Sequence, residues 1–253
     1  MVKYTVRDAV SSKTVVIFDL FHTLTSLEST WSGNPSSAAS DSQKSEFSES
    51  NSGGPLTSTM LGISREAWNE QLLEKSRQRL AGEWKDPFVF IEVMAHAIDP
   101  SIPDDVIKAA VINRINRFAH AMRGIPVEHA NVLKELKTRG KKIALISNAD
   151  VTEVAAWDES PIASLFDSTV FSCKVGYVKP EREIYESCLS ELGVPASDCV
   201  YVGDGGSDEL KGAKSLGMTT VMITGEVEHI WPDKLAARKK DADFVIVKLV
   251  ELM

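Results

Sequence analysis

Short apolar runs that end in polar or small residues recur along the 253-residue chain, and they constrain its fold more than any other feature. Their length and β-branched content are typical of buried parallel strands. The six runs are Thr14–Phe18, Lys142–Ile146, Thr169–Phe171, Cys199–Val202, Thr219–Ile223 and Phe244–Val247. Between the later runs lie three helix-like segments, each followed or closed by a glycine: Val127–Arg139, Glu181–Leu192 and Asp208–Leu216. The alternation predicts an α/β fold with a doubly wound parallel sheet.

More than a hundred residues separate the first run from the second. The stretch Ser26–Thr59 is rich in Ser, Gly and Asn and is expected to be a mobile loop, with Trp31 and Phe47 as its only aromatic anchors. Three helical stretches follow: Ser64–Leu80, opened by Ser64 as N-cap, Pro87–Ile98 and Pro103–Met122. We therefore expect a core domain of residues 1–25 and 124–253 and a helical cap domain of residues 26–123.

Composition and charge narrow the class of partner. The formal net charge of -8 argues against nucleic acid or an anionic membrane surface as the partner. No apolar run approaches the ~20 residues that cross a bilayer. The three cysteines, Cys173, Cys188 and Cys199, form no metal-ligand spacing and are expected to be reduced, buried thiols of a cytoplasmic protein. The oligomeric state stays open.

Four polar stretches stand at or beside the ends of predicted strands, where open α/β sheets bind ligands. They contribute, in chain order, Asp19, then Ser147 with Asn148, then Lys179 before a proline, then Asp204 and Asp208 around a glycine-rich turn. A strand-end Ser can donate to an anionic oxygen, and a Lys before Pro can neutralise a nucleophile and its bound anion. Two carboxylates four residues apart suit Mg²⁺. Such residues also occur, when taken alone, in ordinary turns, at helix starts or on the solvated surface, although this explains Asp204 poorly.

The four stretches in this order resemble the haloacid dehalogenase (HAD) superfamily, with Leu216-Gly217-Met218 completing the usual run after the fourth. The resemblance implies a HAD-like Rossmannoid core with an inserted helical cap of the C1 type. It also implies that Asp19 is the nucleophile, that Ser147 and Asn148 bind substrate and that Lys179 balances charge. Mg²⁺ would be bound by Asp19, the backbone carbonyl of Phe21, Asp204 and Asp208.

Phe21 departs from this pattern, because phosphatases of the family usually carry a second Asp there as general acid. An aromatic at this position resembles the 2-haloacid dehalogenase branch, but that branch has no acidic metal ligand like Asp204. His22 is one alternative proton donor. A cap lysine acting as a Schiff base, as in the family's phosphonate hydrolases, would have to be Lys75, Lys85 or Lys108, none of which stands in a matching motif.

The sequence therefore predicts a HAD-like hydrolase with an aspartate nucleophile, a Mg²⁺-dependent phosphatase acting on a small phosphorylated metabolite. The alternatives are a 2-haloacid dehalogenase and a catalytically weak HAD-like protein that binds a phosphorylated ligand or a partner protein. Substrate identity is set by the cap, which carries no transferable motif.

Overall fold

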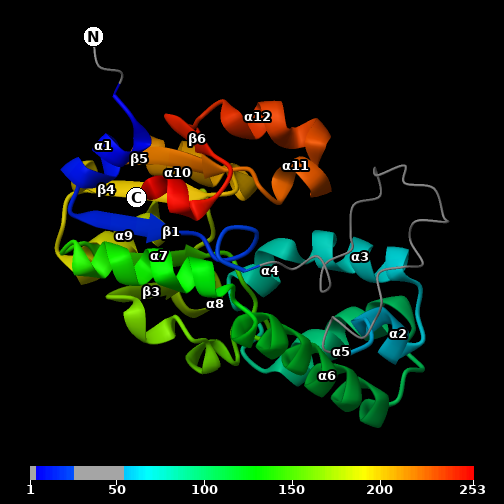
Figure 1. Ribbon diagram of the computed structural model, residues 1–253. Coiled ribbons are helices and arrows are strands. Elements are labelled where there is room, and N and C mark those ends of the chain that lie inside the picture. The colour runs from blue at the N-terminus through cyan, green and yellow to red at the C-terminus, as the bar shows by residue number, and fades with distance from the viewer. Residues whose placement is uncertain (1–3, 26–53) are drawn as a thin grey trace.

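A six-stranded parallel sheet forms the centre of the molecule in the computed structural model, which describes residues 4–25 and 54–253 (Figure 1). The strand order is β3-β2-β1-β4-β5-β6, with β1 and β4 in the middle. The strands are β1 (Val15–Phe18), β2 (Lys142–Ser147), β3 (Ser168–Phe171), β4 (Cys199–Gly203), β5 (Thr219–Ile223) and β6 (Phe244–Ile246). Each predicted apolar run is therefore a strand, within one residue at either end. The doubly wound α/β fold is confirmed.

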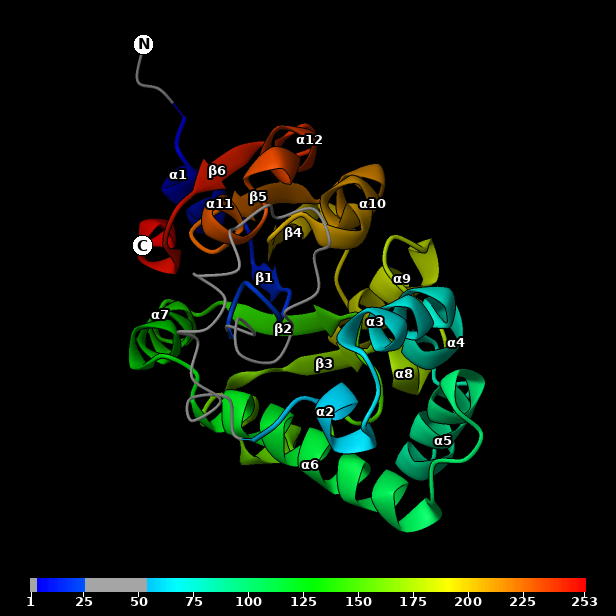
Figure 2. The same cartoon turned by 90° about the vertical axis from the view of Figure 1, so that its right-hand side faces the viewer.

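Alternate residues of the central strands point to opposite faces of the sheet, and each face has its own core. Val16 and Phe18 of β1 belong to a cluster with helix α7, whereas Val15 and Ile17 belong to a cluster with α9 and α10. Figure 2 shows α7 on one side of the sheet and α9 and α10 on the other. These helices are α7 (Val127–Thr138), α9 (Arg182–Leu192) and α10 (Glu209–Ser215), which correspond to the three predicted between the strands.

Between β1 and α7 the structure describes five helices, and four of them contribute residues to a third hydrophobic cluster, which includes Trp68, Phe90 and Ile107. The five helices are α2 (Thr57–Leu61), α3 (Arg65–Glu74), α4 (Ser76–Leu80), α5 (Pro87–Ile98) and α6 (Asp104–Arg123). We call them the cap helices; they lie beyond the strand ends, to one side of the sheet (Figure 1). The predicted division of the chain into domains and the C1 type of cap stay predictions.

Two expectations for this interval need correction. The single helix expected over Ser64–Leu80 is two helices, because Lys75 leaves the helical backbone (φ −93°, ψ 13°), although Ser64 does accept from Ala67 N as an N-cap. The last residues of Ser26–Thr59 begin α2 instead of continuing a loop. Residues 26–53, with Trp31 and Phe47, lie outside the described residues, so the mobility of that segment stays a prediction.

Two arginines of the cap helices reach the segment that follows β2. Arg79 Nη1 lies 3.0 Å from Asp150 Oδ2, and Arg114 Nη2 lies 3.0 Å from the same oxygen and 2.9 Å from Glu153 Oε1. The side chains of Arg114, Asp150 and Glu153 are buried. Buried charges are tolerated only when they are paired, so this cluster fixes where the cap helices meet the core. We call these four residues the cap–core clasp.

Several short helices were not predicted from the sequence patterns. Helix α1 (Val6–Ser12) begins at a capping box between Thr5 and Asp8. Short helices α8 (Ser172–Val175), α11 (Val227–Ile230) and α12 (Leu235–Lys239) follow strands β3 and β5.

The three cysteines are buried and free, as predicted. Among the described helices, none combines the length and apolar character required to cross a bilayer.

Candidate active site

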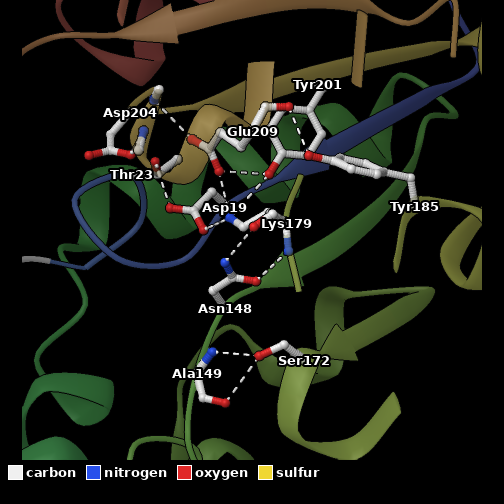
Figure 3. A network of polar contacts seen from close by, with 12 residues as sticks. Asp19, Thr23, Asn148, Ala149, Ser172, Lys179, Tyr185, Tyr201, Asp204 and Glu209 are labelled. Atoms are coloured by element: carbon white, nitrogen blue, oxygen red, sulfur yellow. Dashed lines mark hydrogen bonds and ion pairs between the residues drawn. The ribbon is translucent and has the colours of Figure 1, made fainter. Parts of the chain in front are cut away.

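The parallel register brings two acidic residues together at the carboxyl edge of the sheet. Phe18 of β1 pairs with Val202 of β4, so the next polar residues, Asp19 and Asp204, leave the sheet side by side. Asp19 N donates to Val202 O over 2.9 Å and so continues the ladder by one residue. Both carboxylates are buried, with 5% of each residue exposed. Figure 3 shows them pointing toward the same space, with Lys179 beside Asp19.

Lys179 joins two carboxylates inside the protein. Its ammonium donates to Asp19 Oδ1 and to Glu209 Oε2, each over 2.5 Å, and lies 3.3 Å from the Tyr201 hydroxyl (Figure 3). Glu209 also accepts from Tyr201 at Oε2 over 2.9 Å and from Gly205 N at Oε1 over 2.9 Å. Since only 1% of Glu209 is exposed, its charge is satisfied by these donors instead of by water. Glu209 therefore holds Lys179 against Asp19.

The pKa directions follow from this burial. Burial raises the pKa of Asp19, the adjacent Lys179 opposes that rise and Asp204 adds to it. Burial lowers the pKa of Lys179, but Asp19 and Glu209 raise it more, and the net direction is upward. Burial raises the pKa of Glu209, Lys179 opposes that rise, and Asp19 and Asp204 add to it. The ammonium is the charge that makes closely spaced carboxylates tolerable here.

The turn after β4 decides which acidic side chain enters the site. Ser207 (φ 52°) and Asp208 (φ 51°) both have left-handed backbone, which is unusual for residues other than glycine and concentrates at functional sites. The turn leaves Asp208 exposed and sends Glu209 inward. Asp208, predicted as a metal residue, therefore lies outside the carboxylate cluster, and Glu209, which the sequence analysis missed, lies within it. Its only sequence signal is its place directly after Asp208.

Ser147 ends β2, which lies next to β1 in the sheet, and Asn148 follows it. Ser147 Oγ is fully buried and has no hydrogen-bond partner among the described residues. An unsatisfied buried hydroxyl costs about 1–3 kcal/mol, so a ligand oxygen would relieve it. Asn148 instead binds the main chain of Lys179: Oδ1 accepts from Lys179 N over 2.8 Å and Nδ2 donates to Lys179 O over 3.2 Å. It fixes the loop that carries Lys179, and its predicted contact with substrate stays a prediction.

The turn after Asp19 places the two residues that bear on proton transfer. Phe21 is partly buried and its ring lies edge-on to Phe118 of α6, with centroids 6.1 Å apart. His22 has a left-handed backbone (φ 61°), and its Nδ1 lies 2.9 Å from Glu226 Oε2. The side chain of His22 therefore contacts the C-terminal part of the chain, and among the described hydrogen bonds none joins His22 or Phe21 to Asp19.

The oxygens at the site fit a divalent cation. Asp19, Asp204 and Glu209 each offer a carboxylate oxygen, and these atoms lie within 4.8 Å of one another. Hard oxygen ligands from one or two carboxylates suit Mg²⁺. All three carboxylates already accept hydrogen bonds from donors within the protein, so a bound cation would share their oxygens with those donors. The Phe21 carbonyl stays a predicted ligand.

The fold and this edge define a doubly wound α/β enzyme with an acidic, lysine-bridged site beneath inserted helices. The chain belongs to the haloacid dehalogenase-like hydrolase family, whose model matches residues 13–217. This match confirms the superfamily that the order of the four polar stretches indicated.

Relatives and structural neighbours include both activities considered for this chain. Over 133 residues it is 32% identical to a glyceraldehyde 3-phosphate phosphatase of Methanocaldococcus jannaschii, a match of 51% of this chain and 55% of that protein. The match therefore spans only about half of the relative. A crystal structure of a dehalogenase shares the fold at a TM-score of 0.59 and 20% identity, over 95% of this chain and 96% of that one. A HAD family enzyme from Bacteroides thetaiotaomicron, in complex with magnesium and inorganic phosphate, has a TM-score of 0.52 at 16% identity, over 83% and 94%.

Proposed function

We propose that this hydrolase is a Mg²⁺-dependent phosphatase that acts on a small phosphorylated metabolite with Asp19 as its nucleophile. The observation that carries the proposal is the buried Asp204 carboxylate, with an oxygen within 4.8 Å of Asp19. Two buried carboxylates this close repel each other unless cations lie between or beside them. Asp204 gives a phosphatase a ligand for the cation that accompanies phosphate, whereas the departure of halide from a haloacid requires no such ligand. The phosphatase relative supports the same choice.

In the proposed reaction an oxygen of Asp19 attacks the phosphorus of the substrate. The bond from phosphorus to the leaving oxygen breaks, that oxygen departs with its electron pair, and an aspartyl phosphate forms on Asp19. Water then attacks the aspartyl phosphate and returns Asp19 and inorganic phosphate. Ser147 Oγ donates to a phosphoryl oxygen, and Lys179 keeps Asp19 ionised and offsets the charge of the phosphoryl group. When bound by Asp19 and Asp204, Mg²⁺ would supply further positive charge to the phosphoryl oxygens.

Phe21 supports a second candidate function. A phenyl ring cannot protonate a leaving alkoxide, and it packs on Phe118 of the cap helices where an acid would otherwise stand. A 2-haloacid dehalogenase needs no such acid, because halide leaves as a stable anion. As a phosphatase, the protein would favour substrates whose leaving oxygen is stable without a proton, such as aryl or acyl phosphates.

A small substrate panel separates these functions. The wild-type protein, stripped with EDTA, is assayed on an alkyl phosphate, an aryl phosphate, an acyl phosphate and a 2-haloacid, with and without added Mg²⁺. We expect phosphate release that requires Mg²⁺ and is fastest on aryl and acyl phosphates. Halide release that is indifferent to EDTA would instead identify a dehalogenase. Inertness on the whole panel would favour a binding protein.

A further inference from the structure

Helix α12 places a cation directly on the proposed metal ligand. Arg238 Nη1 contacts Asp204 Oδ2 and lies 3.3 Å from the main-chain oxygen of Asp204. The helix also packs closely onto the neighbouring turn, since a Cβ added at Gly205 would lie 3.0 Å from Arg238 Cβ and 3.4 Å from Arg238 O. Arg238 is thus built against Asp204 from a part of the chain beyond the matched residues 13–217.

The guanidinium of Arg238 is held in this position from its other side. Its central carbon lies 4.7 Å from the centroid of the Trp231 ring, which is itself buried and edge-on to His22 at 4.9 Å. His22 in turn bonds Glu226 of the same C-terminal segment. Residues 226–238 therefore contact both rims of the site, the turn after Asp19 and the turn after β4. A stacked, hydrogen-bonded arginine loses little further freedom in holding its carboxylate.

The charges at the site are divided between two cations. Lys179 bridges Asp19 and Glu209, whereas Arg238 pairs with Asp204. Asp204 Oδ1 accepts from Gly206 N over 2.8 Å, so both oxygens of this carboxylate already have a donor. A divalent cation that binds Asp204 must share it with the guanidinium or displace it, and it meets a like charge within a few ångström.

We propose that Arg238 is a positioning residue that competes with the divalent cation for Asp204 and so holds the Mg²⁺ affinity of the site low. Because Arg238 pairs with Asp204, a cation binds this carboxylate only against the charge of the guanidinium. The inference rests on the proposed Mg²⁺ dependence and adds the residue that sets its concentration range. It acts through Asp204, with no contact to the substrate.

The test is the dissociation constant of Mg²⁺ itself, measured by isothermal titration calorimetry on the full chain without substrate. Arg238→Gln removes the charge, Arg238→Lys retains it, and Lys240→Gln removes a charge from an exposed residue just after the same helix. We expect the Gln variant to bind Mg²⁺ about tenfold more tightly, and the Lys variant and the Lys240→Gln control to stay within about threefold of wild type. Arg238→Ala, a second charge-removing variant, should match the Gln variant, and thermal unfolding in EDTA checks that each protein is folded.

Each other outcome decides against the inference. Unchanged or weaker Mg²⁺ binding by Arg238→Gln and Arg238→Ala, with clear binding by wild type, would overturn the competition while leaving the proposed function standing. Equal tightening by Lys240→Gln would show a general charge effect and also overturn it. Mg²⁺ binding by none of the proteins would overturn both the inference and the proposed metal dependence.

Discussion

The ammonium of Lys179 lies 2.5 Å from an oxygen of Glu209, a residue that sequence reasoning did not single out. The same ammonium lies 2.5 Å from Asp19, so Glu209 controls where the charge beside the proposed nucleophile stands. We predict that Glu209→Gln, which keeps the shape of the side chain, lowers kcat by roughly 10–100-fold. Steady-state kinetics on an aryl phosphate measure it. Glu186→Gln, an exposed acid paired with Arg182, is the matched control and should change little; equal effects of the two variants would refute the assignment.

Phe21 decides whether a general acid is missing. We predict that Phe21→Asp raises the rate on an alkyl phosphate by roughly tenfold or more and changes the rate on an aryl phosphate much less, because only the alkoxide needs a proton. Loss of the ring contact with Phe118 should cost stability by about 1 kcal/mol.

Phe21→Asn is the control for this substitution, since it has the size of Asp but no acid. An equal gain with Asn would show that space, not a proton, limits the reaction. Equal wild-type rates on alkyl and aryl phosphates would mean that another group, with His22 first to be tested, supplies the proton. For a dehalogenase, Phe21→Asp should instead lower activity, because a negative charge would stand near the departing halide.

Asp204 and Asp208 differ in burial, and this difference predicts that replacing each residue changes the Mg²⁺ requirement of the enzyme to a different extent. Asp204 is buried in the carboxylate cluster, whereas Asp208 is exposed beyond it. We predict that Asp204→Asn raises the Mg²⁺ concentration for half-maximal activity by about 100-fold or abolishes activity, because it removes a charged ligand from the site. Asp208→Asn removes the same charge from a nearby residue and should change the Mg²⁺ concentration for half-maximal activity less than about threefold. Similar losses in both variants would restore Asp208 as a direct metal residue.

The cap–core clasp predicts a pH-dependent stability. Burial, with the charge of Asp150 added, raises the pKa of Glu153 from 4.5 to about 7, although Arg79 and Arg114 oppose the rise. The folded protein then holds a proton that the unfolded chain releases near pH 4.5. This stabilisation is complete below pH 4.5 and is lost as the pH rises toward and through 7.

The Glu153→Gln variant lacks this titration. Relative to wild type, its free energy of unfolding should therefore rise by about 1–3 kcal/mol between pH 4.5 and pH 8. Urea unfolding in EDTA, at several pH values, measures the difference. Glu159→Gln, at an exposed residue paired with Arg123, is the control, and its free energy of unfolding should change with pH in the same way as that of wild type. A Glu153→Gln curve that is also parallel to wild type would contradict the raised pKa.

Much of the fold was predictable because its strands are buried on both faces. A strand such as Val15–Phe18, with all four residues buried, is a continuous apolar run, and the residue after it must stand at the sheet edge. Asp19 and Asp204 were therefore found as strand-end residues, and the order of these two with Lys179 along the chain, which resembles the HAD superfamily, indicated their roles. Asp19 and Asp204 lie side by side because β1 and β4 are neighbours in the sheet with this register. The spacing of the two residues in the sequence does not give that register.

The other contacts of the site depend on backbone geometry and long-range contacts that the residue types alone do not indicate. Glu209 points inward instead of Asp208 because two successive residues adopt left-handed backbone, which neither Ser nor Asp requires. Asn148 binds the Lys179 main chain because a loop 31 residues later returns to β2. Arg238 meets Asp204 through a five-residue helix with no motif. Long-range contacts between polar groups leave no periodic trace in a sequence.

The central claim is that Asp19 becomes phosphorylated, and mass spectrometry after rapid quenching tests it directly. Wild-type protein is mixed with Mg²⁺ and an acyl or aryl phosphate, quenched in acid within one turnover and digested with a protease. We predict that the peptide containing Asp19 gains the mass of one phosphoryl group. Asp19→Asn should lose both this adduct and turnover, by several orders of magnitude, while its thermal unfolding stays close to wild type. Phosphate release by wild type without any phosphorylated peptide, or Asp19→Asn activity within about tenfold of wild type, would contradict the account.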